Sequence, residues 1–183
     1  MTTSRIPSHH TLSIEVAREA LAATADDVLL QAGTRLMLVA GLRRGEVQAL
    51  QVRDWQPGED PRLTIRDGCC ERTIRIAPSA AVLLDGYRAG QTADADEPLL
   101  LGLEREGALP RLFGNAMRRA GLKVGVHDLR HAAIAAALED GTPMSHIEAY
   151  FGLEKAETRK DLMPVREGYD RGIAAALEAS FAS

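Results

Sequence analysis

The 183-residue sequence has only two cysteines, and they are adjacent. A disulfide between neighbours is strained and no third cysteine exists, so Cys69 and Cys70 exclude a disulfide framework. Long apolar runs are absent as well: the longest uninterrupted one covers residues 132–138, far short of a transmembrane span. The first ten residues contain no apolar core of the kind found in signal peptides. These absences predict a cytoplasmic protein with no membrane partner.

Aromatic residues are scarce, at 4% of the chain, although 45% of the residues are hydrophobic. The core must therefore be aliphatic. An excess of positive charge is also absent, because 22 basic residues stand against 26 acidic ones for a net charge of −4. This balance argues against a protein that coats nucleic acid through bulk charge alone.

The basic residues are nevertheless unevenly distributed. Residues 61–90 and 111–131 together carry a charge of +6, whereas the rest of the chain carries −10. Arginine outnumbers lysine by 19 to 3, and its planar fork suits phosphate and carboxylate. A salt-bridged surface would explain many of these arginines, but their segregation favours an anion-binding face.

Hydrophobic periodicity predicts a mainly α-helical chain with a small antiparallel β-sheet, an α+β fold. The strand signal lies in residues 52–78, where the alternating segments 63–65 and 73–76 flank the turn formed by Asp67 and Gly68, as in a β-hairpin. Ser13 and Thr11 are the candidate N-caps for the first helix, and Thr142 is one for a helix that starts at Pro143. The predicted helices cover residues 11–25, 25–40, 43–50, 78–89, 110–120, 128–139, 143–151 and 170–182.

We interpret residues 1–10 as a flexible tail and residues 11–183 as one domain. The acidic segment 90–98 is the best candidate for an internal boundary. In the helix predicted over residues 170–182, Ile173, Leu177 and Phe181 share one face. A stripe this narrow on about three turns is not stable alone in water, so it must pack on its own domain or on a partner. We expect a partner, either a second copy or another protein.

Two segments carry residues suited to phosphate chemistry. Arg43 and Arg44 stand at a predicted helix start, and His127 and Arg130 share a face because they are three residues apart. Arginines and a histidine that converge on a phosphate would neutralise its charge and supply a proton-transfer group. Each signal alone is weak, because such arginines more often form caps or salt bridges.

Taken in order, the segments Ala40–Leu50, the hairpin, Val126–His131 and Ser145–Gly152 closely resemble the catalytic domain of the tyrosine recombinase (phage integrase) family. The resemblance covers roughly residues 11–180. It implies a mostly helical domain with a three-stranded sheet that acts on DNA during strand exchange. It also implies that the arginines at positions 43 and 130 clamp the scissile phosphate and that the histidine at position 127 assists proton transfer.

Three family positions are filled differently. The hairpin has no lysine to protonate the leaving oxygen, Leu153 stands where a second histidine or tryptophan is usual, and Leu162 occupies the position of the nucleophilic tyrosine. Leucine cannot form a phosphotyrosyl intermediate. Tyr169, seven residues later, could substitute only through a long detour, and we interpret it and Tyr150 as structural.

The resemblance also implies a helical core-binding domain ahead of the catalytic one, and this sequence has about ten residues there. We therefore interpret the chain as a catalytically inactive recombinase-like protein, a DNA-binding accessory or regulatory factor in integration or recombination of a mobile element. One alternative is a protein that has little DNA affinity itself and modulates an active recombinase; another is an active recombinase that uses Tyr169.

No cofactor and no metal site are expected, and the adjacent cysteines are interpreted as incidental. The predicted phosphate ligands are Arg43, Arg44, Arg66, Arg72, Arg118, Arg119 and Arg130.

Overall fold

The computed structural model describes residues 12–67, 70–89, 94–153 and 168–181. Within these ranges the chain is mostly helical with a three-stranded antiparallel sheet, which confirms the predicted fold class. Its elements are α1 (Ile14–Ala22), α2 (Val28–Val39), α3 (Arg44–Ala49), a 3-10 turn η1 (Val52–Asp54), β1 (Trp55–Gln56), β2 (Arg62–Asp67), β3 (Cys70–Arg75), α4 (Pro78–Arg88), α5 (Ala108–Ala120), α6 (Val126–Glu139), α7 (Met144–Phe151) and α8 (Tyr169–Phe181). The segment 1–10, predicted as a flexible tail, lies outside the described residues.

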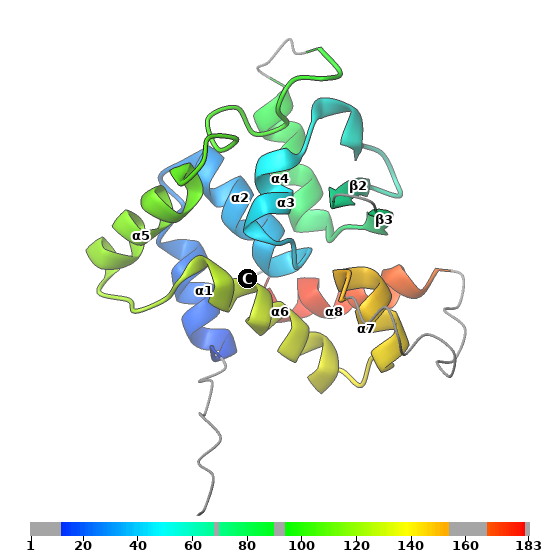
Figure 1. The fold of residues 1–183 in the computed structure, drawn as a ribbon. Helices are drawn as coiled ribbons and strands as arrows, with labels where there is room; N and C mark the ends of the chain where they lie inside the picture. The colour runs from blue at the N-terminus through cyan, green and yellow to red at the C-terminus, as the bar shows by residue number, and fades with distance from the viewer. Residues whose placement is uncertain (1–11, 68–69, 90–93, 154–167, 182–183) are drawn as a thin grey trace, which may run out of the picture.

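Helix α2 is the centre of the fold (Figure 1), since it contacts α1, α3, α4, α5, α6 and α8. Its sequence explains this position: the residues from Leu36 to Val39 are all apolar and all buried, so the helix needs neighbours around it. Gly33 permits close approach on one side, because a Cβ there would lie 2.7 Å from Leu103 Cδ1. The central helix therefore supports several surfaces of the molecule at once.

The sheet has the order β1–β2–β3 with antiparallel pairing. Leu63 pairs with Ile74 on the buried face, as the alternating pattern predicts. Trp55 on β1 is buried, and its indole Nε1 donates to Asp85 Oδ1 of α4 at 3.0 Å. β2 contacts α3, and β3 contacts α8. The sheet is thus held against helices on both sides of its hairpin.

Predicted boundaries are close to the observed ones, with one capping error. Of the two candidates, Ser13 caps α1, since its Oγ accepts from the Val16 N–H at 3.4 Å. Thr142 does not cap α7: Pro143 is the N-cap residue and the helix begins at Met144. The backbone of Pro143 is extended, with ψ of 139°, so this residue precedes the helix instead of opening it.

The acidic segment 90–98, the candidate boundary, is held to its surroundings over the part that the structure describes. The backbone N–H groups of Val52 and Arg53 donate to the carbonyls of Glu97 and Ala95 at 2.9 and 3.0 Å. Buried apolar residues from α1 to α8 form a single cluster. The prediction of one domain over residues 11–183 agrees with this core and stays a prediction.

The C-terminal helix packs against its own chain. Ile173, Leu177 and Phe181 are fully buried, and α8 contacts α1, α2, α6, α7 and β3. Asp170 accepts the backbone N–H of Arg75 at 2.9 Å, which ties α8 to the sheet. The expectation that this stripe docks on a partner is therefore wrong: its apolar face meets the aliphatic core of the same domain. No helix among the described residues is long and apolar enough to cross a membrane.

Candidate functional site

A cavity of about 310 Å³ lies where α2, the start of α3 and the first turns of α6 meet. It brings together four of the residues singled out in the sequence, Arg43, Arg44, His127 and Arg130. Two segments more than 80 residues apart in the chain therefore converge as expected. The lining residues are Met37, Arg43, Arg44, Gly45, His127, Arg130 and His131.

The turn between α2 and α3 positions Arg43 and Arg44. Gly41 ends α2 with φ of +63°, a conformation that L side chains rarely adopt, and a Cβ there would overlap the Phe151 ring. Arg43 is the N-cap residue of α3, and its backbone N–H donates to Glu46 Oε2 at 2.7 Å. Arg44 is exposed at the first helical position. The two arginines thus reach the cavity from a turn that only glycine fits.

The start of α6 positions the other side. Asp128 Oδ2 accepts the backbone N–H of Gly125 at 2.7 Å and so fixes the first turn. His127 and His131 are exposed and stand four residues apart on one helical face, whereas Arg130 is only 8% exposed. The cavity therefore has a buried guanidinium on its inner side and two imidazoles nearer to solvent.

Glu46 is the negative charge at the centre of this arginine cluster. Its side chain is only 3% exposed. Arg72 holds it with two prongs, Nη1 to Oε1 at 2.7 Å and Nη2 to Oε2 at 3.0 Å, and Arg130 Nη1 lies 3.6 Å from Oε2. One buried carboxylate thus compensates two guanidinium groups and also accepts the Arg43 N–H. With Arg43 and Arg44 beside it, the cluster keeps a net positive charge.

The same arginines bind the last carbonyls of α7, which have no partner within the helix. Arg72 Nε donates to the Tyr150 carbonyl at 3.0 Å, and Arg43 Nη2 donates to the Gly152 carbonyl at 2.7 Å. Arg130 donates to the carbonyls of Phe151 and Gly41. Cations at a helix C-terminus are favourable, so these side chains have a structural role as well as a place near the cavity.

Several predicted phosphate ligands lie elsewhere. Arg66 pairs with Asp54 and Glu71. Arg72 donates both of its terminal Nη groups to the Glu46 carboxylate. Because its guanidinium is already bound within the protein, the structure does not support its predicted role as a phosphate ligand. Arg118 and Arg119 are exposed at the end of α5, outside the lining of this cavity.

The residues at the altered family positions are placed as follows. Leu153 is partly buried and packs against the core, whereas Leu162 lies outside the described residues. Tyr169 is the first residue of α8 and is not among the residues that line the cavity; its ring lies 5.5 Å from that of His146. Burial, and secondarily the charge of Asp170, raise the pKa of the Tyr169 hydroxyl, which disfavours a phenolate nucleophile.

Tyr150 has a structural position, as the sequence interpretation holds. It is completely buried, and its hydroxyl donates to the Arg75 carbonyl at 2.9 Å. Burial raises its pKa strongly. Across the described ranges, no group of three or more His, Cys, Asp or Glu side chains is placed to hold a metal ion.

Two residues of the site were missed in the sequence. His131 lies one turn after His127, so the spacing of four residues could have indicated it. Glu46 stands three residues after the N-cap Arg43, the position of an acidic capping residue, and this pattern was the available signal. Nothing local indicated that Glu46 would pair with Arg72 across 26 residues.

The fold of the chain is similar to that of solved structures of two recombinases. The crystal structure of XerA recombinase matches 95% of this chain with a TM-score of 0.68 and 22% sequence identity. The XerH site-specific recombinase, bound to its difH substrate in a pre-cleavage complex, matches 91% with a TM-score of 0.66 and 16% identity. The chain is similar in fold to tyrosine recombinase catalytic domains. It spans 66% of the XerA chain and 53% of the XerH chain.

The recombinase-like fold is supported by structure rather than by sequence searches. No protein-family model matches the chain, and no curated protein matches it. At 16–22% identity, the similarity to these recombinases is one of fold.

Proposed function

We propose that this recombinase-like chain is catalytically inactive and contacts the phosphate backbone of duplex DNA, as an accessory or regulatory factor in recombination. The observation that supports it is the cavity in which Arg43, Arg44 and Arg130 meet His127 and His131. Guanidinium groups at one concave site favour a phosphate oxygen through charge-assisted hydrogen bonds. XerH, which shares the fold, is described as bound to its DNA substrate.

The test is a titration of labelled duplex DNA at two salt concentrations. We expect weak binding, in the range of about 10⁻⁴–10⁻⁶ M typical of non-specific complexes, that weakens steeply with salt. Arg44→Ala is the informative variant, because this side chain is exposed and makes no hydrogen bond or ion pair with the residues that the structure describes. Loss of one phosphate contact should weaken binding about tenfold and lower the salt slope by about 1.

A matched control is Arg53→Ala, which removes the same charge from an exposed arginine that pairs with Asp96 away from the cavity. It should bind nearly as wild type does. If wild type shows no binding at low salt, or if the two variants weaken binding equally, the cavity is not a DNA site.

The absence of catalysis is a second, separate proposal. Leu162 stands where the resemblance places the nucleophilic tyrosine, and Tyr169 is half-buried beside His146. A nicked substrate that traps covalent intermediates should give no protein–DNA adduct that survives SDS. An adduct that disappears in Tyr169→Phe would overturn this proposal and favour an active recombinase.

One observation favours the alternative of a protein-interaction role. Arg72 and Arg130 are held by Glu46 and by the carbonyls that end α7, so part of the cationic cluster stabilises the fold. Binding of an active recombinase by a chain that shows no DNA affinity at low salt would support this alternative.

A further inference from the structure

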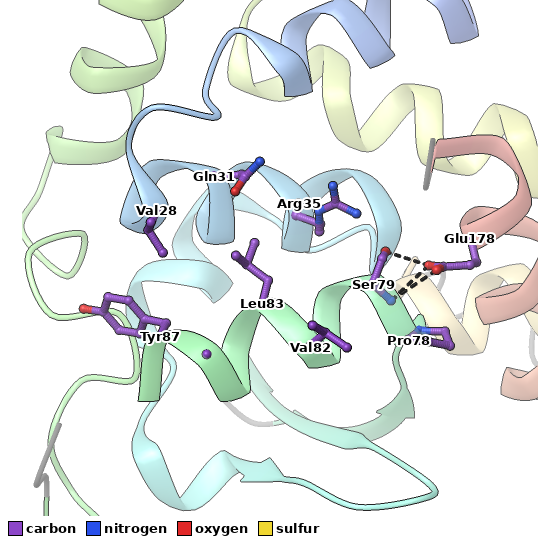
Figure 2. Close-up of a pocket in the computed structure, with 10 residues that line it drawn as sticks. Val28, Gln31, Arg35, Pro78, Ser79, Val82, Leu83, Tyr87 and Glu178 are labelled. Carbon is purple, nitrogen blue, oxygen red and sulfur yellow. Dashed lines mark hydrogen bonds between the residues drawn. The ribbon is translucent and has the colours of Figure 1, made fainter. Parts of the chain in front are cut away.

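A groove with a volume of about 740 Å³ runs between α2 and α4 (Figure 2). The two sites share no lining residue. Glu178 of α8 lies at one end of the groove, where it accepts hydrogen bonds from Ser79, and Tyr87 stands near the other end. The lining residues are Val28, Gln31, Arg35, Pro78, Ser79, Val82, Leu83, Gly86, Tyr87 and Glu178.

Exposed apolar side chains concentrate at this groove. Val82 is 73% exposed and Val28 is 52% exposed, and they stand on α4 and α2, the two helices that form its walls. Among the described residues only five large apolar side chains are exposed, and two of them line this one groove. Contiguous exposed apolar surface bordered by polar groups is typical of an interaction site.

Arg35 gives the groove a positive charge; the Glu178 carboxylate in the same lining acts on it electrostatically, but the two form no ion pair. Its guanidinium is half-buried, and burial lowers its pKa, with the charge of Glu178 opposing the shift. The Glu178 carboxylate is already bound by Ser79, whose Oγ donates to Oε2 at 2.6 Å and whose N–H lies 3.2 Å from Oε1. Within the described part of the chain, Arg35 makes no hydrogen bond or ion pair. A carboxylate supplied from outside would compensate it.

The groove continues beyond Glu178. A second hollow of about 440 Å³ shares Pro78 and Glu178 with it and extends over α8, where Ala175 and Ala179 are exposed. The α4 segment from Pro78 to Tyr87 alone is roughly 13 Å long at 1.5 Å per residue. The combined surface is long and open, with small side chains at one end, which suits a helix of three to four turns better than a compact small molecule.

We propose that this groove docks an acidic amphipathic helix of another protein. The docked helix would place apolar side chains, repeated at helical spacing, over Val28, Val82 and Leu83 of the groove. An acidic side chain of the same helix, beside that apolar stripe, would pair with Arg35. The exposed alanines of α8 allow the end of the helix to approach closely.

The test uses two labelled synthetic helical peptides about 15 residues long. Both carry leucines along one face, but one has glutamates and the other lysines beside that face. The glutamate peptide should bind saturably and about tenfold more tightly than the lysine peptide, because only it pairs with Arg35. Fluorescence anisotropy measures the affinities, and NMR shift mapping of the full chain locates the bound peptide.

Three variants of the chain identify the site. Val82→Glu should weaken the glutamate peptide at least about tenfold, whereas Leu138→Glu, which changes an exposed leucine of α6 outside the groove, should leave it unchanged. Arg35→Gln should remove the preference for glutamate over lysine. Thermal melts confirm that each variant is folded.

Three results would overturn the proposal: no saturable binding of the glutamate peptide up to about 1 mM, an affinity of about −4 kcal/mol; equal binding of both peptides; or binding that survives Val82→Glu. DNA binding by Val82→Glu should equal that of wild type, because the two sites share no residue. Failure here therefore leaves the proposed DNA contact standing, and the reverse also holds.

Discussion

Replacing the buried Glu46 by alanine should destabilise the protein more than replacing an exposed glutamate does. The Glu46 side chain is 3% exposed, and it holds Arg72 with two prongs while Arg130 lies 3.6 Å away. Its removal leaves guanidinium groups buried without a counterion, which costs about 3–5 kcal/mol. It also removes the acceptor of the Arg43 backbone N–H at the start of α3, which adds about 1 kcal/mol.

A loss of about 4–6 kcal/mol is a large part of the roughly 5–15 kcal/mol that stabilises a typical domain. At about 2–4 °C per kcal/mol for a chain of this size, the melting temperature should fall by at least roughly 8 °C. Thermal and urea denaturation followed by circular dichroism measure both quantities.

A matched control is Glu71→Ala. Glu71 pairs with Arg66, but its side chain is 59% exposed, so its loss should change the free energy of unfolding by less than about 1 kcal/mol. Adding Arg72→Met to Glu46→Ala should restore part of the loss, because one uncompensated charge is removed. If Glu46→Ala costs under about 1 kcal/mol, the arginines find other partners or water, and the central role given to this carboxylate is refuted.

Three further changes test the packing around the site. Gly41→Ala should cost about 2–4 kcal/mol in a denaturation experiment, because the positive φ and the Phe151 ring leave no room for a Cβ. Tyr150→Phe should cost about 1–2 kcal/mol, since the buried Arg75 carbonyl loses its donor; an unchanged stability would show that water replaces the hydroxyl. A chain that ends before Tyr169 should fail to fold, because the three buried side chains of the α8 stripe contribute about 5–9 kcal/mol together; a folded, cooperative melt would contradict the packing of α8 in cis.

Local signals predicted most of the fold. The alternation around Asp67 and Gly68 predicted the hairpin, and the helix predicted over residues 25–40 ends at Val39, because both features depend on a few neighbouring residues. The partner of the α8 stripe could not be predicted in the same way. Periodicity shows that Ile173, Leu177 and Phe181 must be buried, but it does not show which surface buries them.

In the site as well, contacts between residues close in sequence were predictable and contacts between distant residues were not. The spacing of His127 and Arg130 predicted their shared face, and the resemblance predicted that Arg43 would lie near them. The role of Arg72 depends on Glu46, which is 26 residues away and meets it only after the hairpin has packed on α3. A sequence motif therefore indicated where the arginines are, but not how many of their donors the fold itself uses.

Only some of the arginines near the cavity are available to contact DNA phosphates. Arg130 is buried and Arg72 is partly buried; both contact Glu46 and donate to the carbonyls at the end of α7, so they stabilise the wall of the cavity. Arg44 is exposed, so it can bind a phosphate without giving up a contact that stabilises the fold. The Arg43 guanidinium already donates to the Gly152 carbonyl and would bind a phosphate oxygen in addition. Binding at this site should therefore draw on fewer charges than the +6 of the two basic windows suggests.

The salt dependence of DNA binding measures that number directly, since each phosphate contact contributes a slope of about 0.9. A slope near 2 fits a cavity served by Arg43 and Arg44, whereas a slope near 6 would require the exposed arginines of α5 and the hairpin as well.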